Sequence, residues 1–207
     1  GVGGDGGDMA ITLAQLGVGN FTLADPERFT INNVNRQTGA SFETIGRFKA
    51  DIIAEMIKDI NPFATVDTFT EGVSSENINQ FMKNANLVID ETEYTTPNIG
   101  VMIAQAARQH NLPNLMALNV GFGSYVTSFH PNGYSYEEWL GLQKDVNPDD
   151  LGEEEVSLSR WLTLPKYTNF DALQKMQNDP NLPTPTVAPG VRMAAADAST
   201  QAIAHLL

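Results

Sequence analysis

The sequence of 207 residues predicts an α/β fold, with a mostly parallel β-sheet and helices on both faces. Three observations support this prediction. A glycine-rich turn at residues 1–7 leads directly into a helical pattern, a short strand pattern then ends at Asp25, and strand and helix patterns continue to alternate as far as about residue 130. Such alternation is typical of parallel sheets, in which each helix connects two strands.

The first seven residues have the composition of a phosphate-binding turn. Gly1, Gly3, Gly4 and Gly6 give the spacing G-x-G-G-x-G. Such a turn lies between a strand and a helix, so that free backbone N–H groups point at an anion. A helix is predicted after it from apolar residues between Met9 and Leu16, and we expect its preceding strand to be missing from this chain. Flexible loops are also rich in glycine, so the turn alone leaves both interpretations open.

The next strand pattern ends in a candidate ribose ligand. Residues 21–24 alternate as a strand, and Asp25 follows 19 residues after Gly6. A nucleotide-binding α/β unit has an acid about 20 residues after its glycines, where the carboxylate accepts hydrogen bonds from the ribose hydroxyls. Asp25 could instead cap a turn with Pro26. In combination with the glycine turn, the ribose interpretation is the better one.

Two cations follow in a chain that has only 12 lysines and arginines. Arg36 lies in the polar segment 32–37. Lys49 lies near the start of an amphipathic helix, whose apolar positions extend from Ile45 to Ile60 and which Asn61-Pro62 ends. A triphosphate needs cations as well as backbone donors, which both residues could supply. The alternative is that both are solvated surface charges, as is usual for Lys and Arg.

The middle of the chain continues the alternation. A strand is predicted at residues 64–70, a short helix from 74 to about 83, and a buried strand at 87–89. Asp90, Glu91 and Glu93 follow this last strand, at the edge of a parallel sheet where ligands bind. A helix is then predicted from Thr96-Pro97 to about residue 110, with further strands at 116–118 and 125–129.

Composition limits the possible partners. A net charge of −13 disfavours nucleic acid or an anionic membrane, and no apolar run reaches the roughly 20 residues of a membrane helix. We therefore expect a soluble, cytoplasmic protein. Cysteine is absent, which excludes disulfides, cysteine zinc sites and thiol nucleophiles in this chain. The three histidines are too dispersed to form a recognisable metal motif, and the run Glu153–Glu155 is expected to be a solvated helix face.

Taken in order, these pieces resemble the superfamily of ThiF, MoeB and the ubiquitin-activating enzymes. The resemblance covers residues 1–130, returns after Gly190 and is absent between them, so it implies an adenylation core at 1–130, a Pro- and acid-rich excursion at 131–189 and a C-terminal helix at 190–207 that packs back on the core. The motifs that carry it are Gly1–Gly6, Asp25-Pro26-Glu27, Asn32–Gln37, Gly46–Ala50, Asn61-Pro62 and Asp90–Tyr94.

The resemblance implies a Rossmann-like ThiF-type nucleotide-binding fold and an ATP-dependent adenylyltransferase. Enzymes of this family use ATP and Mg²⁺ to activate the C-terminal carboxylate of a small ubiquitin-like or sulfur-carrier protein, and a homodimer is implied as well. By carry-over, Asp25 holds the ribose and Glu93 organises Mg²⁺ or the reacting phosphate. The remaining nucleotide-binding positions are Gly1, Gly3, Gly4, Gly6, Asn33, Arg36, Gln37 and Lys49, of which Arg36 and Lys49, like Glu93, are also catalytic.

The sequence departs from the family pattern at a few positions, and two other hypotheses stay open. Glu93 and Tyr94 stand where the family has Asp and Asn, and Asp5 stands at a place that is normally apolar. Glu93, Tyr94 and the absence of cysteine motivate a nucleotide-binding or carrier-binding scaffold without turnover. A nicotinamide-dependent dehydrogenase shares the glycine turn and the ribose acid. The dehydrogenase hypothesis ranks lower, because it gives no role to Arg36, Lys49 or the acid cluster after residue 89.

Overall fold

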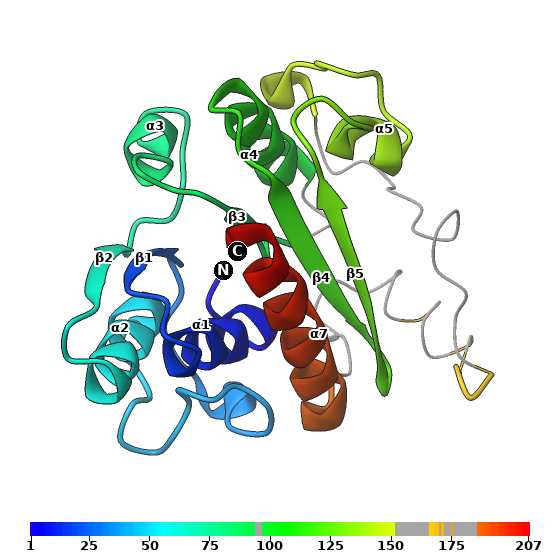
Figure 1. Ribbon diagram of the computed structural model, residues 1–207. Helices are drawn as coiled ribbons and strands as arrows, with labels where there is room; N and C mark the ends of the chain where they lie inside the picture. The colour runs from blue at the N-terminus through cyan, green and yellow to red at the C-terminus, as the bar shows by residue number, and fades with distance from the viewer. Residues whose placement is uncertain (94–96, 152–165, 170, 172–174, 176–185) are drawn as a thin grey trace.

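A computed structural model describes residues 1–93, 97–151, 166–169, 171, 175 and 186–207 (Figure 1). The predictions made for Tyr94, Thr96 and the Glu153–Glu155 run lie outside these residues. Within them the chain has an α/β architecture, as predicted. None of the helices in the described ranges is long and apolar enough to span a membrane.

The first half of the chain forms a two-stranded parallel sheet covered by helices. Strand β1 (Asn20–Ala24) pairs in parallel with β2 (Thr65–Phe69), and α1 (Asp5–Gln15) and α2 (Lys49–Ile60) pack on each other beside them. Ile53 and Ile57 of α2 are fully buried together with Leu23 of β1. Burial of these side chains drives the packing of α2 on the sheet.

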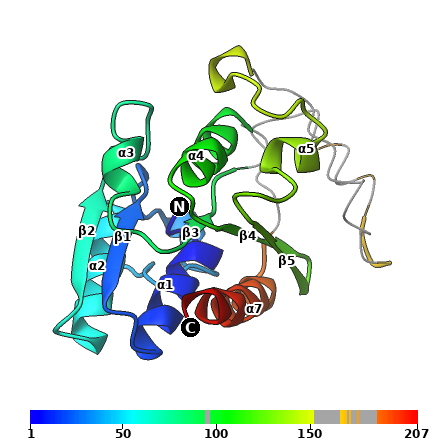
Figure 2. The same ribbon diagram turned by 45° about the horizontal axis from the view of Figure 1, so that its top comes forward.

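The second half forms a mixed three-stranded sheet. Strand β3 (Val88–Asp90) is parallel to β4 (Asn114–Val120), and β4 is antiparallel to β5 (Gly123–Phe129). Helix α4 (Pro97–Gln109) covers one face and α7 (Ala188–Leu206) the other (Figure 2). Successive side chains of β4 follow this division, because Met116 packs with α4 whereas Leu115 and Ala117 pack with α7.

Two shorter helices and two 3₁₀ turns complete the fold of the described residues. They are α3 (Ile78–Phe81), α5 (Tyr136–Leu140), η1 (Ile31–Asn33) and η2 (Pro148–Asp150). Helix α5 begins with a capping box, in which Ser135 Oγ accepts from the Glu138 backbone N–H and the Glu138 side chain accepts from the Ser135 N–H. Both α5 and η2 lie against α4.

Residues 1 and 2 lie between the two sheets. The Val2 N–H donates to Asp25 Oδ2 at the end of β1 (2.9 Å), while Gly1 lies against the Glu91 backbone that follows β3. The chain end marked N in Figure 2 accordingly lies between β1 and β3. The glycine turn therefore starts at the carboxyl ends of strands from both sheets, the edge at which α/β proteins bind ligands.

Two helices are shorter than their apolar patterns predict. The helix expected from Ile45 begins at Lys49, because Gly46 has φ of +86° and Phe48 is extended. Ile45 is exposed in the preceding turn. The helix expected at 74–83 is reduced to Ile78–Phe81, since Asn77 Oδ1 accepts from the Ser74 N–H and holds residues 74–77 in a turn.

Candidate functional site

The glycine turn is too tightly packed for side chains at two of its positions. A Cβ atom on Gly1 would lie 2.5 Å from the Glu91 carbonyl oxygen, and one on Gly6 would lie 2.1 Å from the carbonyl oxygen of Gly1. Both distances are far below any van der Waals contact. The spacing of Gly1 and Gly6 is therefore required by the fold of the turn itself.

The turn leads into a helix whose amino end is open. Gly4 is the N-cap of α1, and no side chain in the described part of the chain caps it. The first N–H groups of a helix have no partner within the helix, and together with the helix dipole they attract anions. Gly3 and Gly4 lie at this end, with Gln37 Nε2 3.3 Å from a Cβ built on Gly3. The arrangement suits a phosphate group.

Asp25 fastens the turn to β1. Its carboxylate is 5% exposed; Oδ2 accepts from the Val2 N–H and Oδ1 from the Glu27 N–H, both at 2.9 Å. The contact with Glu27 confirms the predicted turn-capping role, and the ribose role stays a prediction. A carboxylate has about four acceptor sites, so these two contacts leave capacity for a ribose hydroxyl.

The three predicted nucleotide ligands of the segment 32–37 differ in their distance from the glycine turn. They are Asn33, Arg36 and Gln37. The Arg36 guanidinium donates to the Asn32 carbonyl (3.0 Å) and to Asn35 Oδ1 (2.9 Å). Its charge is near enough to Asp5 of the turn to oppose part of the rise that burial causes in the pKa of Asp5. Gln37 is buried against Gly3, and its Oε1 has no partner among the described residues. Asn33 Oδ1 instead accepts from the N–H and the hydroxyl of Thr30.

Lys49 is not a solvated surface charge. It is 3% exposed at the first position of α2, and its Nζ pairs with Glu27 Oε2 at 2.5 Å. The Glu27 side chain is 70% exposed. The buried Lys49 cation is thus held beside the Asp25-Pro26-Glu27 segment by Glu27, whose side chain is mostly in contact with solvent. Lys49 and Asp25 lie at the same end of β1, since each contacts Glu27.

Glu93 is exposed and lies three residues after the end of β3. Its neighbours Asp90 and Glu91 both make backbone contacts: Asp90 Oδ1 accepts from the Thr92 N–H, and Glu91 Oε1 from the Ala117 N–H. In the described ranges no group of three or more His, Asp or Glu side chains is arranged to hold a metal ion.

The electrostatics of the turn are dominated by buried acids. Burial raises the pKa of Asp5 to about 6, and Asn119 and Arg36 only partly oppose this. The pKa of Glu91 is raised well above its usual range by burial and by the nearby charge of Asp5. Asp8 has a cationic partner, because it pairs with Arg192 of α7. The role of Asn119, which donates to Asp5, could not have been found from the sequence, because 114 residues separate them.

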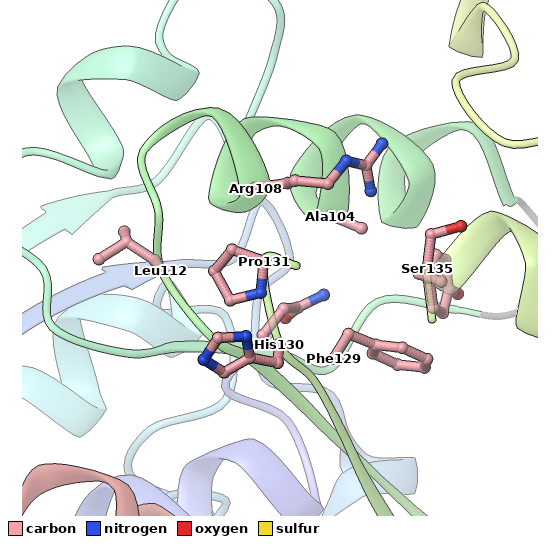
Figure 3. A pocket seen from close by; sticks show the side chains of 9 residues that line it. Ala104, Arg108, Leu112, Phe129, His130, Pro131 and Ser135 are labelled. Atoms are coloured by element: carbon pink, nitrogen blue, oxygen red, sulfur yellow. The ribbon is translucent and has the colours of Figure 1, made fainter. Parts of the chain in front are cut away.

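A small enclosed pocket lies away from this end of the molecule. It has a volume of about 10 Å³, enough for roughly one water molecule, and lies between α4 and the segment that follows β5 (Figure 3). Ala104 and Arg108 line it from α4, with His130 and Pro131 opposite them. None of the predicted site residues lines it, so we do not assign it a role in nucleotide binding.

Comparison with known proteins matches the model of the ThiF family to residues 1–207. The chain is 36% identical over 91 residues to the tRNA threonylcarbamoyladenosine dehydratase of Haemophilus influenzae, covering 44% of the chain and 35% of that protein. It is 28% identical over 131 residues to the sulfur carrier protein ThiS adenylyltransferase of Escherichia coli, covering 63% of the chain and 51% of that protein.

Two solved structures illustrate the similarity of fold. One is E. coli TcdA, a tRNA N6-threonylcarbamoyladenosine dehydratase, in complex with AMP, with a TM-score of 0.54 and 31% identity over 58% of the chain and 50% of that protein. The other is E. coli MccB with ATP, with a TM-score of 0.69 and 18% identity over 100% of the chain and 53% of that protein. The chain spans about half the length, or less, of these relatives.

Proposed function

Since this chain belongs to the ThiF family, we propose that it binds ATP and adenylates the carboxylate of a small carrier protein or peptide. The observation that carries the proposal is the uncapped amino end of α1 at Gly4, with the buried Lys49 and Asp25 together at the nearby end of β1. The names of the relatives support it, because one adenylates a sulfur carrier protein and the two structures hold ATP or AMP.

In this proposal the turn and the cations bind the phosphates. The N–H groups at Gly3, Gly4 and Gly6 donate hydrogen bonds to phosphate oxygens, as those at helix amino ends do. Arg36 approaches from the segment after η1, and Lys49 exchanges its exposed partner Glu27 for a phosphate oxygen. Asp25 holds the ribose through its remaining acceptor sites. Asn33 and Gln37 complete the nucleotide site.

The reaction is a transfer of the adenylyl group. An oxygen of the substrate carboxylate attacks the α-phosphorus, the bond from that phosphorus to the bridging oxygen breaks, and pyrophosphate leaves with the electron pair. Negative charge accumulates on the phosphate oxygens, so Arg36 and Lys49 stabilise the transition state by position and charge. With no cysteine in the chain, the acyl-adenylate is the product that this chain can form alone.

Mg²⁺ is compatible with the exposed position of Glu93. Magnesium commonly takes only one or two protein carboxylates and fills its other positions with phosphate oxygens and water, so it does not require a cluster of acids. Glu93 would hold the ion, which would neutralise charge on the phosphates. We further propose the organisation predicted above, with a core at 1–130, an excursion at 131–189 and a final helix at 190–207, in a cytoplasmic homodimer.

Pyrophosphate exchange tests the proposed activity. The full-length protein is incubated with ATP, Mg²⁺, labelled pyrophosphate and a panel of carrier proteins and peptides with free C-terminal carboxylates. We expect label to enter ATP only when an accepted substrate is present, because exchange requires a reversible adenylation. Absence of substrate-dependent exchange across a wide panel would reject the adenylyltransferase proposal.

A scaffold without turnover is the second candidate, and Glu93 favours it. Glu is one methylene longer than the Asp of the family, and displacements of an ångström at a reacting centre strongly reduce rate. The scaffold predicts nucleotide binding without exchange. Glu93→Asp distinguishes the two candidates further, because recovery of exchange in this variant would indicate an enzyme weakened at one position.

A further inference from the structure

Polar side chains from three elements meet beside the glycine turn. Asp5 comes from the first turn of α1, Glu91 follows β3, and Asn119 lies near the end of β4. Asn119 Nδ2 lies 2.8 Å from Asp5 Oδ2 and 3.1 Å from Asp5 Oδ1. The Asp5 side chain is buried, and one amide therefore fixes both of its oxygens against β4.

The contact with Asn119 keeps the Asp5 carboxylate away from the N–H groups at the amino end of α1. An aspartate in the first turn of a helix is well placed to interact with the N–H groups at the amino end. Here the N-cap is Gly4, without any side-chain cap in the described part of the chain. Because Asn119 holds its carboxylate, Asp5 leaves these N–H groups available to an external anion.

The charges around Asp5 explain why the position of its carboxylate should affect phosphate binding. Asp8 from α1 and Glu91 face it as like charges, and Arg36 faces it as a cation beyond hydrogen-bond distance. Glu91 in turn faces the like charges of Asp5 and Asp90. Neither Asp5 nor Glu91 has an ion pair among the described residues. An Asp5 carboxylate released toward the turn would repel phosphate.

We propose that Asn119 is a positioning residue for nucleotide binding, which holds the Asp5 carboxylate on β4 and so keeps the amino end of α1 open for phosphate. This inference rests on the proposed function for its role, and on the Asp5–Asn119 contact for its geometry. The sequence explains why Asp5 needs a partner such as Asn119. Asp5 stands where the motif normally has an apolar residue, which would need no partner.

The inference also couples nucleotide binding to protons. A protonated Asp5 adds no negative charge beside the phosphates, and the pKa of this group is raised to about 6 by burial. Affinity for ATP should therefore fall as pH rises from about 5.5 to 7.5. Replacing Asp5 by Asn removes the titrating group while retaining a similar shape, so it should flatten this part of the profile.

Calorimetric titration with Mg²⁺–ATP at pH 7.5 tests the proposal on the full-length protein. Asn119→Ala should weaken binding by about tenfold, which corresponds to about 1.4 kcal/mol. In the Asp5→Asn background the same change should matter less than about threefold, because no charge is left to release. Asn119→Ser provides a second variant if Asn119→Ala unfolds, and thermal unfolding confirms that each variant is folded.

A loss that is equal in the two backgrounds would overturn the proposal, because it would show that Asn119 acts independently of Asp5. The proposed function fails separately, if the unmodified protein binds no Mg²⁺–ATP. A crystal structure of Asn119→Ala, or of Asn119→Ser, decides the positioning claim in that case. We expect the Asp5 carboxylate to accept from N–H groups of the first turn of α1, and a carboxylate still on the β4 side would contradict the claim.

Discussion

Two buried acids at opposite ends of the molecule have pKa values that are shifted in opposite directions. Glu137 of α5 is fully buried and accepts from both terminal nitrogens of Arg108 (2.7 and 3.2 Å) and from Gln105 (3.2 Å), with the consequence that its pKa is lowered. Asp5 is almost as buried, but its direct side-chain partner is the neutral Asn119, and burial raises its pKa. A cationic partner keeps a buried acid charged, whereas a buried acid with a neutral partner takes up a proton at a higher pH.

The ion pairs of the two regions show the same contrast. In the α4–α5 region the acid is buried, with Glu137 at 0% exposed, and Arg108 is 20% exposed. Beside the glycine turn the cation is buried, with Lys49 at 4%, and its partner Glu27 is 70% exposed. Loss of Arg108 strands a buried charge, but loss of Lys49 leaves Glu27 in water. The first pair should therefore matter for stability and the second for binding.

The largest expected effect is on stability, from Arg108→Ala. This change leaves Glu137 charged and buried without its cation, and it also removes the Arg108 contact to Asp145, so we expect a loss of about 3 kcal/mol in the free energy of unfolding. Urea denaturation followed by circular dichroism measures it. A loss below about 1 kcal/mol would show that the two regions do not differ in this way.

The next effect is on binding, from Lys49→Ala. We expect affinity for Mg²⁺–ATP to fall by at least about tenfold, or 1.4 kcal/mol, because a buried cation at the phosphate site is lost. Arg36→Ala should act similarly, and Lys58→Ala on the exposed side of α2 is the matched control with no expected effect. If the Lys49 and Lys58 variants had equal affinity for Mg²⁺–ATP, Lys49 would not be part of the phosphate site.

A smaller effect concerns the pH dependence of stability. Because the pKa of folded Asp5 is raised to about 6 from 3.8, the folded protein binds its proton more tightly than the unfolded chain, and the contribution of Asp5 to stability declines as pH rises through this range. Glu137 has the opposite sign, since its lowered pKa contributes stability that is lost as pH falls below about 4.5. Unfolding titrations from pH 4 to 7 should show a flatter slope for Asp5→Asn than for the unmodified protein.

The smallest effect is expected for an exposed ion pair. Arg47 and Glu55 lie 2.5 Å apart, but their side chains are 48% and 57% exposed. Arg47→Ala should change the free energy of unfolding by about 0.5 kcal/mol or less, because such charges are already well solvated. The same urea denaturation compares it with Arg108→Ala, and a loss as large as that of the Arg108 variant would show that burial is not the deciding factor.

The local features of the sequence predicted most of the fold. The Gly1–Gly6 spacing, the strand ending at Asp25 and the alternation up to residue 129 are found as expected, because turn chemistry and hydrophobic period act over short distances. The start of α2 was predicted too early, since the left-handed Gly46 separates Ile45 from the helix. Periodicity alone does not show such a break.

The site was predictable to a lesser degree, for a physical reason. The motif singled out Lys49, whose role stays a prediction, but its ion pair with Glu27 joins residues 22 positions apart. The Asp5–Asn119 contact joins α1 to β4 across most of the chain, and it arises only when the strands are placed side by side. An acid in a glycine turn signals that a partner is needed, without indicating which residue provides it.

Equilibrium competition between nucleotides tests the central claim most directly. The full-length protein is saturated with a fluorescent ATP analogue and Mg²⁺, and ATP or NADH is then added. If Gly1–Gly6, Arg36 and Lys49 form a triphosphate site, ATP displaces the analogue and NADH does not at the same concentration, and Lys49→Ala weakens the displacement by ATP. Displacement by NADH in preference to ATP would contradict the account and favour a nicotinamide site.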